Sequence, residues 1–364
     1  MPLINTTFKT NTLYLDGKEY KLSNKQEILT RLTSTKLSNN TKPIFGTSAI
    51  NEIMLSRDFD DHCTNSTLAT LHKSFKLAVQ QTLQQHGLEF NDEIINKILG
   101  CNTTKEFDDK FNFEHGGRIR TYLTFIKQQL PFAGNENLQR YIQPSDIRQN
   151  LVTQNFDEIY AQEVKLHDGI LTGIGKINLF KDSIPFINIS LSIISNNIQA
   201  NLDKASILFQ NLIPINNFCG IDYSKNIGIE QGKPHFSYLA LAMNKIFGID
   251  LNSKQETSGK LFIYSGDRDK DVEFAVNAHR RGIASVGILH DVSSLTSNAQ
   301  IKQQLLEFSQ EVPIFILSGD INDTVAELTE TEIGICEAVQ IHNQNFSGLS
   351  NLSSLPTSQF QNAA

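Results

Sequence analysis

An acidic loop between a strand pattern and a helix pattern constrains the fold most strongly. Residues Leu261 to Tyr264 form an apolar run, and the loop from Gly266 to Asp271 follows with three aspartates. The next residues, Val272 to Ala278, have the apolar spacing of a helix. This order predicts carboxylates at the carboxyl end of a buried strand, where open α/β sheets place their active sites. Clustered carboxylates repel one another there, and a hard divalent cation relieves the repulsion.

Helix and strand patterns alternate from Asp168 onward. We expect helices near 168–181, 198–212, 235–248, 271–281, 298–309 and 321–330, and strands near 187–194, 217–221, 261–265, 284–289 and 313–317. A further apolar strand is expected at 50–55. Alternation with nearly continuous apolar strands predicts a Rossmann-like, doubly wound parallel sheet of the α/β class, covered by helices on both faces.

Three other stretches depart from this alternation. Residues 1–45 are expected to form an N-terminal extension, with a hairpin that turns at Asp16-Gly17 and a short helix. Residues 67–166 show helix patterns only, so we expect an inserted all-helical domain. Residues 343–364 are rich in Asn, Ser and Gln, which predicts a disordered tail. The α/β core is then formed by residues 46–66 and 167–342.

Composition and charge exclude several classes of partner. The chain of 364 residues has a net charge of −7 and no long basic run, so no nucleic acid partner is expected. No apolar run approaches the ~20 residues that span a bilayer, so no membrane partner is expected either. The four cysteines are scattered, and the first residues lack the pattern of a signal peptide. We therefore expect reduced thiols and a cytoplasmic location.

Chemically active side chains stand beside four of these elements. They are Asp58 and Asp60 after the strand at 50–55, Ser195 and Asn196 after the strand at 187–194, Lys233 before the helix at 235–248, and Asp267 and Asp271 in the acidic loop. In a doubly wound sheet these places can meet at one crevice. Together they would supply carboxylates, a hydroxyl donor and a cation.

The four segments resemble the motifs of the haloacid dehalogenase-like hydrolase superfamily. The matching segments are Asp58-Phe59-Asp60, Ser195-Asn196, Gly232-Lys233-Pro234-His235 and Gly266 to Asp271. The resemblance covers about residues 46–335, and the helical insertion resembles the helical cap of that family. Within the insertion, residues 114–120 are loosely similar to the branch that contains β-phosphoglucomutase and phosphoglycolate phosphatase.

The resemblance implies a role for each motif residue. Asp58 would be the nucleophile that forms an aspartyl-phosphate, and Asp60 would be the general acid and base. Ser195 and Lys233 would hold and neutralise the phosphoryl group. Substrate contacts are further implied for His62, Asn196 and Arg118, and Mg²⁺ ligation is implied for Asp58, the Asp60 carbonyl, Asp267 and Asp271. The cap would close over a small phosphorylated substrate.

Three residues beside the first motif depart from the family pattern. Arg57 stands where an apolar residue is usual, and Asp61 and His62 replace a Gly and a Thr. That Thr helps to bind phosphate, so His62 is expected either to donate a hydrogen bond in its place or to mark altered chemistry.

The preferred hypothesis is a Mg²⁺-dependent phosphoric monoester hydrolase that acts through Asp58. One alternative is a sugar phosphomutase of the β-phosphoglucomutase type. The other is a catalytically impaired binding or regulatory protein, which Arg57, Asp61 and His62 favour. The N-terminal extension is a candidate contact for a homo-oligomer or a protein partner.

Overall fold

The computed structural model describes most of the chain between residues 11 and 346. The described residues are 11–34, 37, 43–60, 62–65, 67–85, 87, 89–104, 106–107, 149–184, 186–221, 232–251, 254–291, 295–319 and 321–346. The chain divides into two compact units, one of residues 1–63 and 166–364 and the other of residues 64–165.

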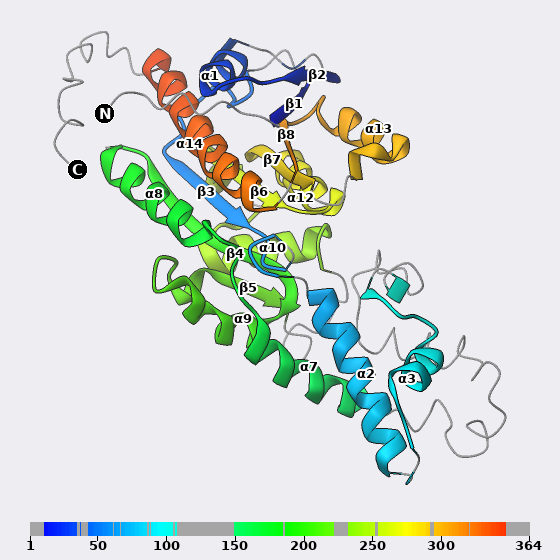
Figure 1. Ribbon diagram of the computed structural model, residues 1–364. Helices are drawn as coiled ribbons and strands as arrows, with labels where there is room; N and C mark the ends of the chain where they lie inside the picture. Colours follow the sequence, from blue (N-terminus) through cyan, green and yellow to red (C-terminus); the bar gives the residue numbers. More distant parts are fainter. Residues whose placement is uncertain are drawn as a thin grey trace, which may run out of the picture. The chain divides into compact units, whose positions relative to one another are not determined.

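The first unit is built on an eight-stranded sheet (Figure 1). Its strands are β1 (Asn11–Leu15), β2 (Lys18–Lys21), β3 (Glu52–Arg57), β4 (Asn188–Ile198), β5 (Phe218–Ile221), β6 (Lys260–Gly266), β7 (Ala284–Asp291) and β8 (Ile314–Ser318). They lie in the order β2-β1-β8-β7-β6-β3-β4-β5. Strands β3 to β8 pair in parallel, whereas β1 is antiparallel to both β2 and β8. The chain therefore has an α/β fold with a mostly parallel sheet.

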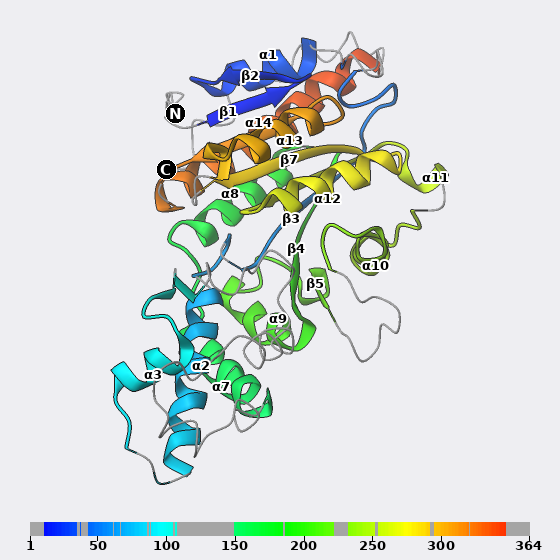
Figure 2. The same cartoon turned by 90° about the vertical axis from the view of Figure 1, so that its right-hand side faces the viewer.

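Helices cover both faces of this sheet. The described helices of the unit are α1 (Lys25–Ser34), α8 (Ile170–Ser183), α9 (Gln199–Ala205), α10 (Phe236–Phe247), α11 (Lys254–Thr257), α12 (Asp269–Arg280), α13 (Ala299–Phe308) and α14 (Ile321–Phe346). On one face, α10 and α12 pack on a core that includes Met54, Tyr264 and Phe274. Figure 2 shows α12 running along β7. Glu332 of α14 contacts Arg57. Arg57 lies three residues after Met54 on β3, and side chains an odd number of residues apart point to opposite faces of a sheet. Helix α14 therefore covers the face opposite to α10 and α12.

Residues 11–21, which were expected to belong to an extension beside the core, instead form two strands of the core sheet. Strands β1 and β2 pair around Asp16-Gly17, and β1 then pairs with β8. All five residues of β1 are buried. An isolated hairpin is at best marginally stable, and the apolar side chains of β1 are covered only because the hairpin joins the sheet.

Helix α14 is longer than the sequence pattern indicates. It runs to Phe346, so residues 343–346, which were assigned to a disordered tail, are helical. The side chain of Asn343 explains this, because it accepts a hydrogen bond from the Ile50 amide at 2.8 Å and donates one to the Ile50 carbonyl at 2.6 Å. A polar composition alone does not reveal such a contact with the start of β3.

The second unit is helical in its described part. Its helices include α2 (Thr67–Gln85), α3 (Asp92–Leu99) and α7 (Gln149–Glu163), and α2 packs against both α3 and α7. Phe75 and Phe107 lie in its interior with ring centroids 5.5 Å apart. Residues 114–120, with Arg118 among them, lie outside the described residues.

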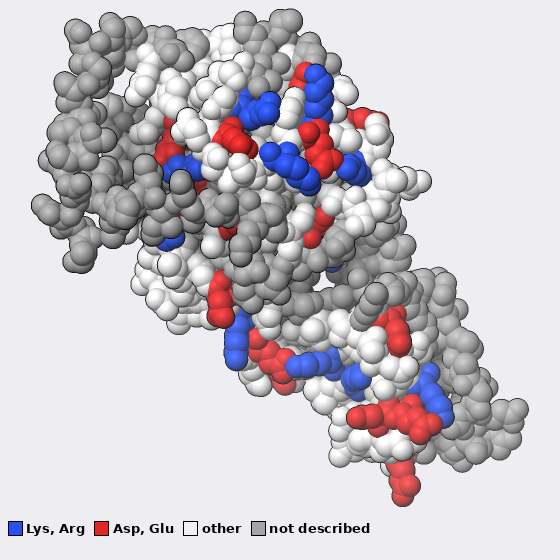
Figure 3. Space-filling model, turned by 45° about the horizontal axis from the view of Figure 1, so that its top comes forward, with Lys and Arg blue, Asp and Glu red and all other residues white. Residues whose placement is uncertain are grey.

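Both signs of charge lie close together on the face shown in Figure 3. On the face in Figure 3, Lys and Arg side chains lie beside those of Asp and Glu. Ion pairs of the described residues include Lys25–Glu337 and Arg280–Glu311, with N–O distances of 2.7 Å and 2.6 Å. Among the helices that the structure describes, none has the length and apolarity needed to cross a membrane.

Candidate functional site

The carboxyl ends of β3, β4 and β6 bring the motif residues together. In the sheet β3 lies between β4 and β6, and Arg57 pairs with Ile193 on one side and Ser265 on the other. One residue later, the Asp58 amide donates a hydrogen bond to the Ser265 carbonyl at 2.8 Å. Asp58, the end of β4 and the loop after β6 therefore lie at one edge of the sheet, where sites of open α/β sheets form.

Lys233 lies at the centre of an ion-pair cluster. Its ammonium group is 2.9 Å from Oδ1 of Asp58 and 2.6 Å from Oδ1 of Asp271, and it donates a hydrogen bond to the Tyr264 hydroxyl at 2.9 Å. The side chain is only 2% exposed. Burial lowers the pKa of Lys233, but the nearby charges of Asp271 and Asp58 outweigh burial and raise it overall. The ammonium therefore stays charged at neutral pH.

Asp58 is held in an environment that resists its ionisation. Burial raises the pKa of Asp58 to about 7, Lys233 opposes this rise, and Asp271 and Asp60 add to it. The folded protein thus binds a proton on Asp58 more tightly than the unfolded chain does. The contribution of this group to stability consequently falls as the pH rises from about 4 to about 7. Additional positive charge beside Asp58 would favour its carboxylate.

Three carboxylates at this edge fit the donor set of a hard divalent cation. Oxygen atoms of Asp58, Asp267 and Asp271 lie within 4.8 Å of one another. Lys233 balances part of this charge, and the half-exposed Arg268 pairs with Asp267 at 3.1 Å. The remaining excess of carboxylate oxygens is the arrangement that Mg²⁺ prefers. The Asp60 carboxylate is not in this group, and its expected metal contact through the backbone carbonyl stays a prediction.

Gly266 allows the third carboxylate to approach. A Cβ atom at this position would lie 2.2 Å from Oδ2 of Asp271. The same Oδ2 accepts a hydrogen bond from the Arg268 amide at 3.1 Å, which fixes Asp271 at the start of α12. Because residue 266 has no side chain, the Asp271 carboxylate has room to lie where it contacts Lys233.

Gly266→Ala is expected to lower the free energy of unfolding by about 1–3 kcal/mol, because the methyl group must displace Asp271. Chemical denaturation would measure this change. Gly175→Ala is the matched control, since a Cβ at Gly175 in α8 meets nothing within 4 Å and should leave stability equal or higher. Equal stability of Gly266→Ala and the wild type would show that Asp271 is not held as described.

Asp60 is bound to the end of β4 through both carboxylate oxygens. The Ser195 hydroxyl donates to Oδ2 and the Asn197 amide nitrogen donates to Oδ1, each at 3.0 Å. The sequence prediction named Ser195 but missed Asn197. The available signal was strand periodicity, because residues two apart on a strand point to the same side.

Asn196 serves the loop before α10. Its Oδ1 accepts a hydrogen bond from the Lys233 amide at 2.7 Å. A Cβ at Gly232 would lie 2.1 Å from this oxygen, so the glycine permits the contact. Asn196 thereby fixes the backbone of Lys233, whereas its predicted contact with substrate stays a prediction.

Arg57 and His62 point into the interior on the α14 side. The Arg57 guanidinium forms a buried ion pair with Glu332, with Nε 3.0 Å from Oε1. His62 is fully buried, and its ring nitrogens lie 3.1 Å from the Ser265 hydroxyl and 3.3 Å from Nδ1 of His290. Burial, then His290 and Arg57, lower the pKa of His62 well below its usual range. His62 is therefore a buried residue whose imidazole favours the neutral form, and its predicted contact with substrate stays a prediction.

Two further sequence assignments have different outcomes. Tyr264 was placed on a strand without a role, but its hydroxyl accepts from Lys233 and donates to the Ile194 carbonyl at 2.6 Å. It thus links the ion-pair cluster to β4, and no motif signals this. Arg118 and Asp61 lie outside the described residues.

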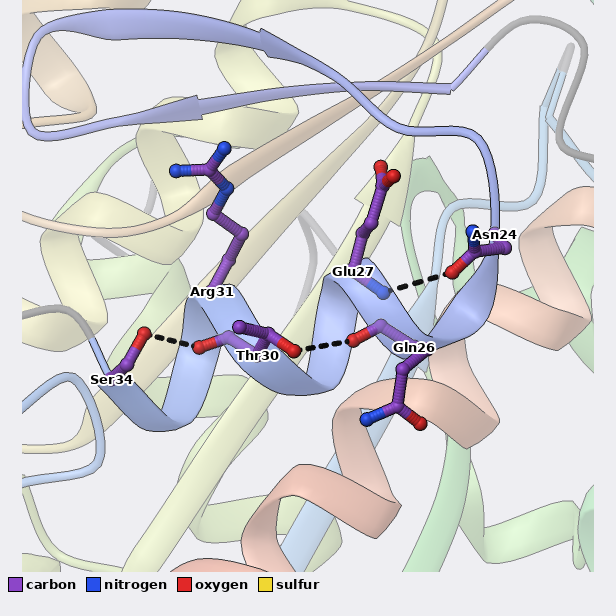
Figure 4. A pocket seen from close by; sticks show the side chains of 6 residues that line it. All are labelled: Asn24, Gln26, Glu27, Thr30, Arg31 and Ser34. Atoms are coloured by element: carbon purple, nitrogen blue, oxygen red, sulfur yellow. Dashed lines mark hydrogen bonds between the residues drawn. The ribbon is translucent and has the colours of Figure 1, made fainter.

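A separate hollow of about 380 Å³ lies along α1 (Figure 4). It is lined by Asn24, Gln26, Glu27, Thr30, Arg31 and Ser34. Several of its polar groups already bond within the helix, as when Asn24 Oδ1 accepts from the Glu27 amide at 3.1 Å. The hollow contains none of the motif residues, so the strand ends remain the candidate site.

Comparison with known proteins gives likenesses of structure. No family model and no curated protein matches the chain. One similar structure is a Thermotoga maritima protein assigned as a β-phosphoglucomutase. The match covers 77% of this chain and 99% of that protein, with 12% sequence identity and a TM-score of 0.42. Another is a Haemophilus somnus protein assigned as a phosphoglycolate phosphatase. The match covers 78% of this chain and 100% of that protein, with 13% sequence identity and a TM-score of 0.39.

The likenesses are too distant to choose an activity, so the chemistry is inferred from the site residues themselves.

Proposed function

We propose that the chain is a Mg²⁺-dependent phosphatase that hydrolyses a small phosphorylated metabolite through an aspartyl-phosphate on Asp58. The observation that carries this proposal is the contact of the Asp58 carboxylate with buried Lys233, within a group of three close carboxylates. The residues proposed as nucleophile and as metal ligands therefore lie beside a buried cation. Phosphoryl transfer needs each of them.

The residues at the strand ends have complementary tasks in this reaction. Asp58 would attack phosphorus, and Lys233 would neutralise both the attacking carboxylate and a phosphoryl oxygen. The Ser195 hydroxyl would donate a hydrogen bond to another phosphoryl oxygen. Asp60 would give a proton to the leaving oxygen and later take one from water.

Mg²⁺ would be held by Asp58, Asp267 and Asp271, with a further ligand expected from the Asp60 carbonyl. When bound, it would supply positive charge that screens the phosphoryl group and the Asp58 carboxylate from each other. Asp271 would in addition keep Lys233 in place, as their 2.6 Å contact supports.

The test of this function is a panel of phosphate monoesters assayed with Mg²⁺ and with a chelator. We expect hydrolysis with Mg²⁺ and none with the chelator. Asp267→Asn should raise the Mg²⁺ concentration for half-maximal activity at least about 10-fold, because it removes a charged ligand. Asp269→Asn, an equal change of charge outside the carboxylate group, is the control and should have little effect. Chelator-resistant hydrolysis would contradict the proposal.

A second experiment, which follows the discharge of the phosphorylated protein, separates the phosphatase from the mutase alternative. After Asp58 is phosphorylated, discharge by water identifies a phosphatase, and discharge by a sugar phosphate identifies a mutase. Mg²⁺-dependent binding of phosphate analogues without turnover would instead favour the impaired binding protein. Arg57 does not favour that alternative, since its guanidinium forms a buried ion pair with Glu332 of α14.

A further inference from the structure

A directional chain of hydrogen bonds ends at Asp60. Nδ2 of Asn201 donates to Oδ1 of Asn197 at 3.1 Å, and Nδ2 of Asn197 donates to Oδ1 of Asp60 at 3.0 Å. Asn201 is buried, with 2% of its surface exposed. Because Asn201 engages the carbonyl oxygen of the Asn197 side chain, the amide nitrogen of Asn197 faces Asp60. The chain thus presents a fixed donor to a carboxylate.

The second oxygen of Asp60 has a donor that the substrate also needs. Oδ2 accepts from the Ser195 hydroxyl at 3.0 Å, and the backbone N–H of Asn197 donates to Oγ of Ser195 at 3.1 Å. A hydroxyl carries a single proton, so Ser195 can donate to Asp60 or to a phosphoryl oxygen, but not to both. Binding of phosphate to Ser195 therefore removes the hydrogen bond from Ser195 to Oδ2, while Oδ1 remains on Asn197.

We propose that Asn197, oriented by Asn201, is a positioning residue for proton transfer by Asp60; this rests on the proposed phosphatase activity. Asn197 holds Oδ1 throughout the reaction, and Oδ2 carries the proton. In the first step Oδ2 gives a proton, taken up earlier from solvent, to the leaving oxygen. At the same time the bond between Asp58 and phosphorus forms and the bond from phosphorus to the leaving oxygen breaks.

The second step returns Asp60 to its starting state. Water attacks phosphorus and gives a proton to Oδ2, and the bond between phosphorus and Asp58 breaks. Inorganic phosphate is released and the Asp58 carboxylate is restored. Without Asn197, Asp60 would lose the donor to Oδ1 at the moment when Ser195 turns to the phosphoryl group.

The test compares leaving groups that need a proton to different degrees. p-Nitrophenolate leaves readily without one, whereas phenolate benefits from protonation. Asn197→Ala should lower kcat on phenyl phosphate about 10-fold more than on p-nitrophenyl phosphate, because general acid catalysis contributes about 10²–10⁴-fold. Asn201→Asp keeps the size of the side chain but removes the donor, so it should turn the Asn197 amide and give the same selective loss.

Asn178→Ala is the matched control. Asn178 lies in α8, and its side chain donates a hydrogen bond to the Leu212 carbonyl at 3.1 Å, not to a motif residue. Its removal should not change the ratio of the two rates. Equal losses on both substrates in Asn197→Ala and Asn201→Asp would overturn the positioning role and leave the phosphatase activity standing. Absence of hydrolysis by the wild type would overturn both.

A structural readout covers the case in which a variant fails to fold. In a crystal of the wild type with Mg²⁺ and beryllofluoride, we expect Oγ of Ser195 on a fluoride and Oδ1 of Asp60 still on Asn197. A structure in which Ser195 still bonds Asp60, or in which Asp60 has left Asn197, would overturn the proposal.

Discussion

Asp58→Asn is expected to lower phosphatase activity at least about 1,000-fold, because it removes the nucleophile and keeps the size of the side chain. The measurement is kcat on an activated aryl phosphate with saturating Mg²⁺. Activity close to that of the wild type would exclude Asp58 as the attacking group.

The same substitution should leave the fold intact. Burial raises the pKa of Asp58 to about 7, so the ionised carboxylate disfavours the folded state above that pH. A neutral amide avoids this cost, and Lys233 keeps Asp271 as a partner. We therefore expect the free energy of unfolding of Asp58→Asn, measured without metal at about pH 8, to be equal to or higher than that of the wild type. Lost activity together with lost stability would point to misfolding instead.

Lys233→Met is expected to reduce stability by about 3–5 kcal/mol at neutral pH, because it leaves two buried carboxylates without their shared cation. Activity should be lost as well. The deficit should shrink as the pH is lowered, since a protonated carboxyl group needs no counterion, and Mg²⁺ should restore part of the stability. Urea unfolding at about pH 8 and about pH 5, with and without Mg²⁺, would measure these changes.

Lys260→Met is the control for this substitution. Lys260 at the start of β6 forms an ion pair with Glu52, but both side chains are partly exposed. Loss of such a pair should cost no more than about 1 kcal/mol. If the two lysine variants lost equal stability, the buried cluster around Lys233 would not be the central ionic element of this site.

The motif residues could be located from sequence because each follows or precedes an element with a strong apolar pattern. The run before Asp267 is nearly continuous in apolar residues, and apolar residues recur through the stretches before Asp58 and Ser195, which favours buried strands. Parallel strands deliver their carboxyl ends to one edge, so the approach of Asp58 to Asp267 and Asp271 follows from the topology.

The contacts that hold these residues could not be read in the same way. Whether Arg57 faces a substrate or the interior depends on Glu332, which lies far away in the sequence on α14. His62 likewise meets His290 of β7. Such pairs have no sequence signal, since either residue alone is typical of a solvent-exposed position.

The ends of the chain were misjudged for a related reason. The sequence of hairpin β1–β2 does not reveal that β1 pairs with the edge of β8, so the hairpin was expected to form a separate extension. Asn343 reads as part of a polar tail until Ile50 is known to lie beside it. Local patterns predict an element, but its place in the sheet depends on partners elsewhere in the chain.

The most direct test of the central claim is to identify the phosphorylated residue. The protein is mixed with substrate and Mg²⁺, quenched in acid, reduced with borohydride and sequenced by mass spectrometry. Borohydride converts an aspartyl-phosphate to homoserine, so the account predicts homoserine at position 58 in the wild type and none in Asp58→Asn. Turnover without any modification at position 58, or with modification of another residue, would contradict it.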